Sequence, residues 1–210
     1  MEVLGILNNI GALIVGSHIV YTSGRHGAAY VNKDAVYPHV RITSDLCREI
    51  AEHFSDEKIY GIEAVAAPAV GGVILATWTA YWLQALTGRK ALMVYADKDG
   101  DNFVFKRGYD KLIPDRRVLV VEDVLTTGGS AKKVVEAVRS LGGKVLGVGV
   151  LCNRGGITAQ DLGDIPELFA LTKVNLDSWP EEECPLCRDG VPINIDVGKG
   201  REFLARKATE

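Results

Sequence analysis

The most informative chemistry of this chain lies in residues 118–130, where four apolar residues lead into two adjacent acids and then a turn of glycine and hydroxyl residues. The apolar run favours a buried strand, and the apolar spacing after the turn fits a helix. Two glycines let the backbone approach a ligand, and three hydroxyls lie beside the free N–H groups of a helix N-terminus, where an anion is favoured. The turn is therefore predicted to bind a phosphate, with Ser130 as the helix N-cap. The predicted cradle comprises Val124, Leu125, Thr126, Thr127, Gly128, Gly129 and Ser130.

The two acids before this turn, Glu122 and Asp123, indicate which kind of phosphate it binds. Adjacent carboxylates repel a bare phosphate unless they meet hydroxyl groups or a cation. A sugar phosphate supplies such hydroxyls, so the stretch predicts a ribose 5-phosphate site in which the acids hold the ring diol. A plain strand-loop-helix connection would explain the glycines but not the paired acids. A dinucleotide fold is disfavoured, because neither a Gly-x-Gly-x-x-Gly pattern nor a Walker-type Gly-Lys-Ser/Thr sequence stands at this turn.

These residues need a scaffold of alternating strands and helices, and the apolar periodicity of the chain predicts one. The alternation implies an α/β fold with a doubly wound parallel sheet, and the N-terminal segment is expected to form a small hood lobe. The chain is interpreted as one domain, with residues 1–40 contributing to the hood, residues 55–175 forming the core sheet and residues 176–210 forming a C-terminal extension. Strands are expected at Ile62–Ala67, Ala91–Ala96, Arg117–Val121 and Lys144–Cys152, short extended pieces within His18–Asp34, and helices at Met1–Gly16, Thr43–Phe54 (capped by Thr43 or Ser44), Val73–Leu86 and Ala131–Arg139.

Ligands of such sheets bind at the carboxyl ends of the strands, so the loops that follow the strands are expected to meet at one pocket. These loops are Ala67–Gly72, Asp97–Lys111, Glu122–Ser130 and Asn153–Gly156.

Composition limits the classes of protein to be considered. A chain of 210 residues with 47% hydrophobic and 24% charged residues is long enough for one well-buried α/β core. The net charge of -3 gives no electrostatic reason to expect a nucleic acid or an anionic membrane as partner. No apolar run approaches the ~20 residues that span a bilayer. The N-terminal residues lack the basic leader of a signal peptide, so a cytoplasmic protein is expected.

Two of the four cysteines suggest a metal. Cys184 and Cys187 form a Cys-x-x-Cys turn followed by glycine, which has the form of half a zinc knuckle. No second pair of this type is visible, so completion of the site would need Cys152, a histidine or a second subunit. Two reduced thiols in a tight turn are the alternative interpretation, and disulfides are not expected in a cytoplasmic protein.

The acid pair followed by Thr-Thr-Gly-Gly-Ser resembles the phosphoribosyl pyrophosphate motif of the type I phosphoribosyltransferases. Over about Ile6–Gly156 the chain is most similar to the orotate-specific branch of that family. The resemblance implies transfer of ribose 5-phosphate from phosphoribosyl pyrophosphate to a ring nitrogen of orotate, with Mg²⁺ as cofactor and a homodimer as the assembly. It also implies catalytic roles for Glu122 and Asp123, which would hold the ribose hydroxyls and stabilise the cationic sugar.

The resemblance assigns residues to the base and to pyrophosphate. A Ser-Gly-Arg segment precedes Tyr30 and Val31, which would lie against the orotate ring. Arg154 matches an arginine beside orotate, and a guanidinium suits a carboxylate because it offers two parallel N–H donors. Thr126 would add a polar contact to the same base. The turn formed by Val70, Gly71 and Gly72 resembles the pyrophosphate loop, whose backbone N–H groups bind the leaving group.

The charged segment Asp97–Arg116 suits a mobile lid over the site. In the family this lid delivers a lysine and a histidine to pyrophosphate, but the usual Lys-x-x-Lys-x-His arrangement is missing here. Lys98 stands at the expected basic start of the lid and is assigned a catalytic role, with Lys106 as a further phosphoribosyl pyrophosphate ligand. A solvated charged hairpin is the alternative. The candidate cations of this segment that could neutralise the leaving pyrophosphate are Lys98, Lys106, Arg107 and Lys111.

Two other functions remain open at the level of sequence. A phosphoribosyltransferase for another base, such as a purine or uracil, would keep the cradle but would not need Arg154 to pair with a carboxylate. A non-catalytic member of the fold could sense phosphoribosyl pyrophosphate and regulate nucleic acid. The acidic balance and the lack of a basic helix count against that regulator.

Overall fold

The computed structural model describes residues 3–56, 59–174 and 177–209, and it divides into two compact units. Unit 1 combines the two ends of the chain, Met1–Val36 and Asn175–Glu210, and unit 2 is the intervening segment Tyr37–Val174. The C-terminal extension therefore folds with the N-terminal segment. Among the described residues, no helix combines the length and the apolar character needed to cross a bilayer.

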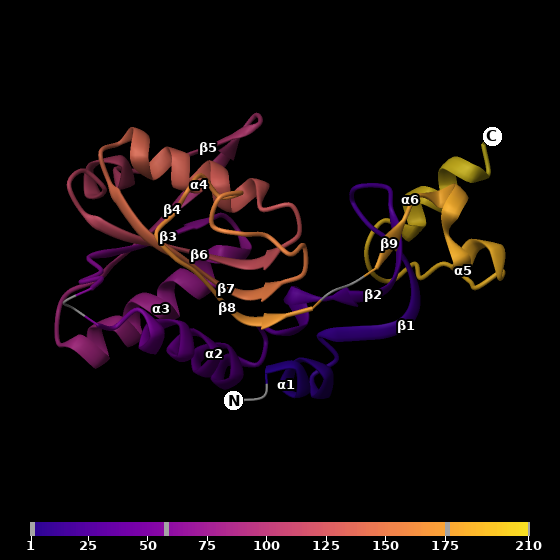
Figure 1. The fold of residues 1–210 in the computed structure, drawn as a ribbon, viewed down its shortest axis with the longest axis horizontal. Coiled ribbons are helices and arrows are strands. Elements are labelled where there is room, and N and C mark those ends of the chain that lie inside the picture. Colours follow the sequence, from indigo (N-terminus) through magenta and orange to yellow (C-terminus); the bar gives the residue numbers. More distant parts are fainter. Residues whose placement is uncertain (1–2, 57–58, 175–176, 210) are drawn as a thin grey trace. The chain divides into compact units, whose positions relative to one another are not determined.

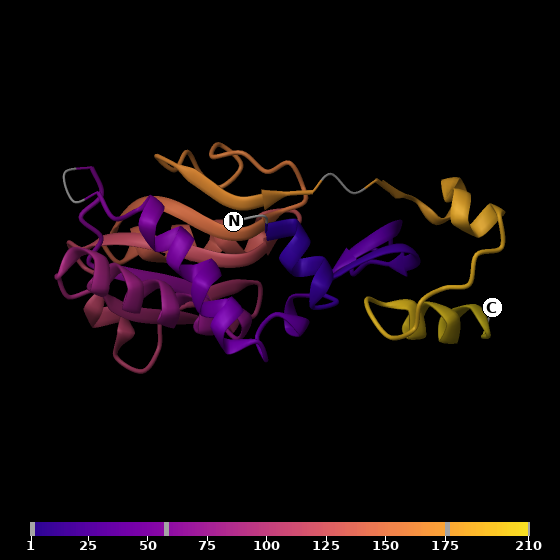
Figure 2. The same ribbon diagram turned by 90° about the horizontal axis from the view of Figure 1, so that it is seen from below.

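Unit 2 is built on a six-stranded sheet with the order β5-β4-β3-β6-β7-β8 (Figure 1). All neighbouring strands are parallel except the β4–β5 pair at one edge. α4 covers one face of the sheet, and α2 and α3 cover the other (Figures 1 and 2). The strands are β3 (Ala64–Pro68), β4 (Leu92–Asp99), β5 (Asn102–Val104), β6 (Arg117–Leu125), β7 (Lys144–Asn153) and β8 (Leu168–Lys173), and the helices are α2 (Val40–His53), α3 (Gly71–Thr87), α4 (Gly129–Ser140) and the short 3-10 helix η2 (Tyr109–Leu112).

The central strands are mostly apolar because helices bury both faces of the sheet. Every residue of β3 is buried, and so are most residues of β6 and β7. One core cluster joins the face of these strands to α4, through residues such as Val120, Val134 and Val148. The expected α/β fold with a doubly wound, mainly parallel sheet is confirmed, and β5 and β8 extend it beyond the four strands that periodicity predicted.

Several expected element boundaries and caps in unit 2 were wrong. The helix expected at 43–54 begins at Val40, with His39 as N-cap and no side-chain cap. Thr43 and Ser44 are instead buried within it, and Ser44 Oγ accepts a hydrogen bond from Trp82 Nε1 at 3.0 Å. The strand expected to end at residue 121 continues to Leu125, because the buried ladder to β7 continues past the acids. Ser130 does not cap α4, whose N-cap is Gly128.

Unit 1 contains a small antiparallel sheet of the order β1-β2-β9. β1 and β2 form the hairpin expected from His18–Asp34, but the helix expected at 1–16 is short, because residues from Leu13 onward pair with β2. The described elements are α1 (Val3–Asn9), β1 (Leu13–Val20), β2 (His26–Val31), the 3-10 helix η1 (Lys33–Ala35), β9 (Ser178–Trp179), the 3-10 helix η3 (Glu181–Glu183), α5 (Pro185–Arg188) and α6 (Gly200–Lys207).

Candidate active site

The predicted phosphate cradle lies between the end of β6 and the start of α4. Gly128 adopts a left-handed conformation with φ of 74°, and a Cβ there would lie 2.9 Å from Leu162 Cδ2. A side chain would therefore be both strained and crowded at this position. Thr126, Thr127 and Ser130 are exposed, and Gly129 N–H donates to Thr127 Oγ1 at 3.4 Å. The turn thus offers hydroxyls and the first N–H groups of a 12-residue helix to an anion.

The two acids lie inside β6, three and two residues before its end. Both are buried, with 7% of Glu122 and 4% of Asp123 exposed. Each carboxylate accepts a hydrogen bond from the next backbone N–H, Asp123 N to Glu122 Oε1 at 3.1 Å and Val124 N to Asp123 Oδ1 at 2.7 Å. These bonds fix the orientation of both carboxylates.

Tyr37 is a site residue that the sequence did not reveal. Its hydroxyl donates a hydrogen bond to Asp123 Oδ2 at 3.1 Å, although 86 residues separate the two in sequence. No motif surrounds Tyr37, and only its position just before α2 brings it to the end of β6. Asp123 is therefore oriented both by its own backbone and by another segment of unit 2.

The expected pyrophosphate loop connects β3 to α3. β3 ends at Pro68 and α3 begins at Gly71, so the backbone of Val70, Gly71 and Gly72 forms the N-terminus of a 17-residue helix. Val70 is 84% exposed. Ala69 N–H donates to Ala96 O at 2.8 Å, which ties this loop to β4. The geometry fits the anion-binding role expected for the loop.

The loop that carries Arg154 is bound directly to the cradle. The N–H groups of Arg154 and Gly155 both donate to Leu125 O at 3.0 Å. Asn153 closes the loop, since its side chain donates to Ile157 O at 2.7 Å and accepts from Ile157 N at 3.0 Å. The half-buried Arg154 thus lies at the same sheet edge as Thr126.

The expected lid forms a hairpin followed by η2. Lys98, on β4, is exposed and pairs with Phe103 of β5. Two of the other cations have acidic partners in the same hairpin: Lys106 Nζ lies 3.3 Å from Asp99 Oδ1, and Arg107 Nη1 lies 3.1 Å from Asp97 Oδ2. Lys111 is exposed on η2. Lys98 has no ion pair within the described part of the chain.

Unit 2 therefore brings together most of the predicted site, because β3, β6 and β7 are parallel neighbours whose following loops leave the same edge of the sheet. Tyr30 and Val31 belong to β2 of unit 1, where Tyr30 is half-buried and Val31 is buried.

The cysteines also divide between the units. Cys152 is buried on β7, and burial raises the pKa of its thiol to about 11, whereas Cys184 and Cys187 lie in unit 1 near His18 and His26.

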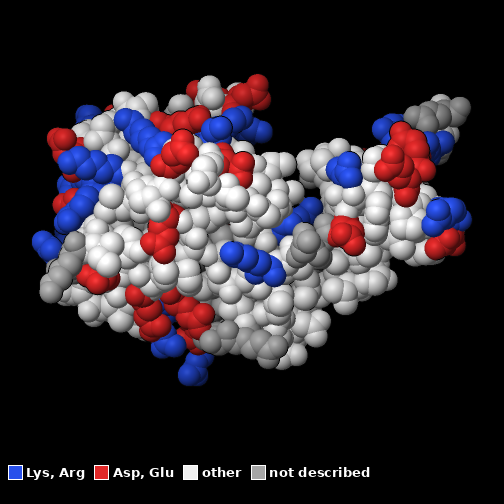
Figure 3. Space-filling model, in the orientation of Figure 1, with Lys and Arg blue, Asp and Glu red and all other residues white. Residues whose placement is uncertain are grey.

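Acidic and basic side chains are interspersed over the face shown in Figure 3, where neither sign forms a continuous surface. Such a mixed surface agrees with the small net charge of -3.

Comparison with known proteins assigns the chain and its fold to one family. The family model described as a phosphoribosyl transferase domain matches residues 34–183. The chain belongs to the phosphoribosyltransferase family. Several of its curated relatives within that family are named orotate phosphoribosyltransferase. One from Pelotomaculum thermopropionicum is 39% identical over 191 residues, covering 91% of this chain and 93% of the relative, and one from Chlorobium phaeobacteroides is 34% identical over 201 residues, covering 95% and 96%.

A solved structure agrees with this assignment. Orotate phosphoribosyltransferase from Aeropyrum pernix superimposes with a TM-score of 0.65 at 25% identity, covering 82% of this chain and 93% of that one. The resemblance read from the acid pair and the cradle is therefore confirmed at the level of family and fold.

Proposed function

We propose that this protein is an enzyme that transfers ribose 5-phosphate from phosphoribosyl pyrophosphate to orotate, giving orotidine monophosphate and pyrophosphate for pyrimidine nucleotide synthesis. The observation that carries the proposal is the joining of the Arg154 loop to the cradle, since both loop N–H groups bond to Leu125 O. An arginine suited to a carboxylate thus lies beside a site suited to a sugar phosphate. The curated relatives named orotate phosphoribosyltransferase support the choice of orotate as the base.

In the proposed reaction a ring nitrogen of orotate forms a bond to C1 of the ribose as the bond from C1 to the pyrophosphate oxygen breaks. Pyrophosphate leaves with the bonding electron pair, and positive charge develops on the sugar. The cradle would hold the 5-phosphate, while Glu122 and Asp123 would hold the ring hydroxyls and stabilise that charge. Catalysis would consist chiefly of positioning and of electrostatic stabilisation.

The leaving group needs positive charge and N–H donors. The start of α3 at Val70, Gly71 and Gly72 would donate N–H groups to pyrophosphate, and Lys98 would supply a cation from the hairpin. Mg²⁺ is proposed as cofactor because Glu122 and Asp123 carry hard oxygen donors next to the place where phosphates would bind. When bound, it would neutralise charge on the departing pyrophosphate.

Some proposals rest on the family resemblance alone. They are the binding of the orotate ring by Tyr30 and Val31 and a homodimer as the assembly. A cytoplasmic location stays a prediction from the sequence.

The first experiment mixes the purified protein with Mg²⁺, phosphoribosyl pyrophosphate and orotate, and follows orotate absorbance together with pyrophosphate release. Coupled loss of orotate and appearance of pyrophosphate is the expected result. Binding of phosphoribosyl pyrophosphate is measured in parallel by calorimetry. Binding without turnover would contradict the proposal and would favour another base or a sensing role.

Arg154 separates orotate from other bases. In the Arg154→Ala variant the KM for orotate is expected to rise by about 10²-fold, since a charge-assisted contact contributes roughly 2–3 kcal/mol, while the KM for phosphoribosyl pyrophosphate stays near that of the wild type. Uracil and purines serve as competing bases in the same assay. Equal use of uracil and orotate by the wild type would overturn the assignment of the base.

A further inference from the structure

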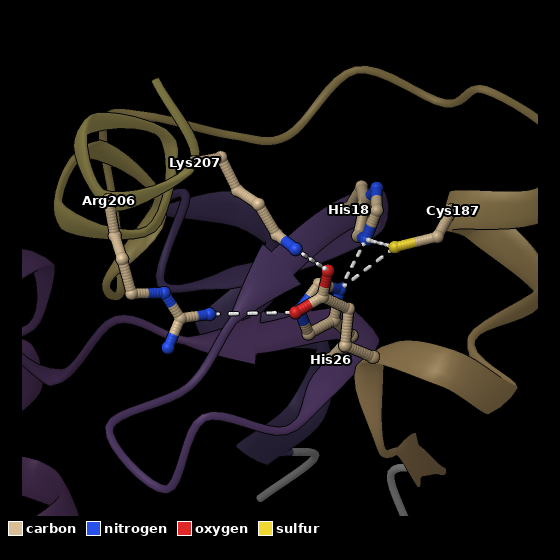
Figure 4. A network of polar contacts seen from close by, with 6 residues as sticks. His18, His26, Cys187, Arg206 and Lys207 are labelled. Atoms are coloured by element: carbon tan, nitrogen blue, oxygen red, sulfur yellow. Dashed lines mark hydrogen bonds and ion pairs between the residues drawn. The ribbon is translucent and has the colours of Figure 1, made fainter. Parts of the chain in front are cut away.

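Four side chains from the two ends of the chain converge inside unit 1. His18 lies on β1, His26 begins β2, Cys184 precedes α5 and Cys187 lies within it. One ligand atom from each, two imidazole nitrogens and two sulfurs, lies within 4.8 Å of all the others. Figure 4 shows His18, His26 and Cys187 directed toward one another. His18 and His26 precede Cys184 by 166 and 158 residues and Cys187 by 169 and 161 residues, so local turn chemistry did not bring them together.

Four of the six distances among these atoms fit a tetrahedral metal shell. His18 Nε2 lies 2.9 Å from His26 Nδ1, and it lies 3.6 Å from each sulfur. Cys187 Sγ lies 3.3 Å from His26 Nδ1. Zinc bonds of ~2.3 Å to sulfur and ~2.0–2.1 Å to nitrogen would give tetrahedron edges of about 3.3 Å between nitrogens and about 3.6 Å between nitrogen and sulfur. The observed distances agree with these edges to within a few tenths of an ångström.

The surroundings of His18 fix the imidazole tautomer that metal binding through Nε2 requires. His18 Nδ1 lies 2.7 Å from Val191 O, and a carbonyl can only accept, so Nδ1 carries the proton and Nε2 presents its lone pair to the cluster. Metal-bound histidines are usually oriented in this way by a backbone carbonyl on the other ring nitrogen. This bond is a second observation that points to a ligand, independent of the spacing of the cysteines.

Three of the four ligand residues are buried, and Cys187 is half-buried. His18, His26 and Cys184 are 1%, 0% and 2% exposed, and the ring of Phe203 packs edge-on to His26 with 4.9 Å between centroids. Glu181 is engaged elsewhere, because its carboxylate pairs with Lys207 Nζ at 2.7 Å and with Arg206 Nη2 at 3.5 Å. The four nitrogen and sulfur atoms therefore form a complete shell without a carboxylate and without an open position for a substrate.

We propose that His18 Nε2, His26 Nδ1, Cys184 Sγ and Cys187 Sγ bind one structural Zn²⁺ ion. Two thiolates and two imidazoles in a tetrahedral arrangement select zinc over Mg²⁺ and Ca²⁺, which prefer oxygen. Binding releases the two thiol protons, and no electron transfer is involved.

The ion would join the β1–β2 hairpin to the C-terminal segment. Unit 1 consists of two chain ends and has only short elements, and units of that size commonly need a metal or disulfides to be stable. The other described links between the two segments include the bonds from Arg25 to the side chain and backbone of Ser178. Zinc would add a much stronger link at the centre of the unit.

The test begins with the untagged full chain, purified in reducing buffer without chelator. Inductively coupled plasma mass spectrometry is expected to find one Zn²⁺ per chain. Removal of the metal with a chelator at neutral pH should accelerate hydrogen exchange in β1, β2 and α5, while hydrogen exchange in β6 stays unchanged. Metal-free protein titrated with Co²⁺ should develop the visible bands of tetrahedral cobalt and a thiolate charge-transfer band, with an end point at one equivalent. These measurements need no variant that might fail to fold.

Variants then identify the ligands. Cys187→Ser and His26→Asn are expected to bind Zn²⁺ at least about 100-fold more weakly, since changes outside the ligand shell alone cost about 10–100-fold. Cys152→Ala removes a buried cysteine of unit 2 and is the matched control, expected to keep one ion per chain. The proposal is overturned if reduced wild-type protein takes up neither Zn²⁺ nor Co²⁺. It is equally overturned if folded Cys187→Ser and His26→Asn proteins keep the wild-type affinity for Zn²⁺. The same holds if the hydrogen-exchange rates of β1, β2 and α5 are equal in the reduced metal-free protein and the zinc-loaded protein.

Discussion

Gly155 packs directly against the backbone carbonyl of Thr126, so closely that a Cβ at residue 155 would overlap the carbonyl oxygen. Its N–H also donates to Leu125 O at 3.0 Å. The loop after β7 therefore packs against Thr126 of the phosphate cradle. This contact joins the two loops that the proposed reaction uses, one for the base and one for the sugar phosphate.

Gly155→Ala is expected to push these two loops apart. Overpacking of this kind costs roughly 1–3 kcal/mol of folding stability, and the displaced loops should raise the KM values of both orotate and phosphoribosyl pyrophosphate. Thermal unfolding and steady-state kinetics measure the two effects. A variant with wild-type stability and both KM values unchanged would show that the contact does not position the site.

Tyr37→Phe removes the hydroxyl that bonds to Asp123 Oδ2 at 3.1 Å and keeps the ring. Because a bond to a charged group is worth roughly 1.5–3 kcal/mol, we expect a several-fold or greater fall in kcat/KM for phosphoribosyl pyrophosphate. Tyr60→Phe is the matched control, because the Tyr60 hydroxyl donates its hydrogen bond to Glu167, which lies outside the proposed site. Equal loss of activity in both variants would indicate a general effect on unit 2.

Lys98→Ala is expected to lower kcat more than any other single substitution among the hairpin cations. Lys106 and Arg107 already neutralise Asp99 and Asp97, whereas Lys98 has no such partner in the described residues. Loss of one cation that stabilises a leaving group typically costs ~10²–10³ in kcat. Lys111→Ala serves as control and should change kcat less than about threefold. Near-normal turnover by Lys98→Ala would show that another cation stabilises the leaving pyrophosphate.

Glu167 predicts a pH dependence of stability. The hydrogen bond from Tyr60 is the main cause that lowers the pKa of Glu167 below its ordinary value of 4.5, and His53, whose Nε2 lies 2.6 Å from Glu167 Oε1, lowers it further. A lowered folded-state pKa adds stability that is present above 4.5 and is lost as the pH falls through the folded value. Glu167→Gln should therefore lower the Tm at neutral pH, and the difference from wild type should shrink in acid. A difference that is constant with pH would contradict this account, and the effect is expected to be small because the side chain is 35% exposed.

The sequence alone determined the local parts of this protein. The apolar run of β6, the Thr-Thr-Gly-Gly-Ser turn and the stripe of α4 depend on residues that are neighbours in the chain, so periodicity and turn chemistry identified the strand, cradle and helix. The parallel sheet followed because strands alternated with helices. Element ends were less predictable, since α2 begins before Thr43 and β6 continues through Glu122 and Asp123 for reasons of burial and pairing.

Only the tertiary structure decided which distant residues meet. Tyr37 reaches Asp123 across 86 residues, and His18 reaches Cys184 across 166. A single tyrosine or histidine has no periodic or turn signal, and its partner is set by how the strands and chain ends pack. The Cys-x-x-Cys turn could therefore be recognised as half a metal site from the sequence, whereas its two histidines became visible only when β1 and β2 were placed beside α5.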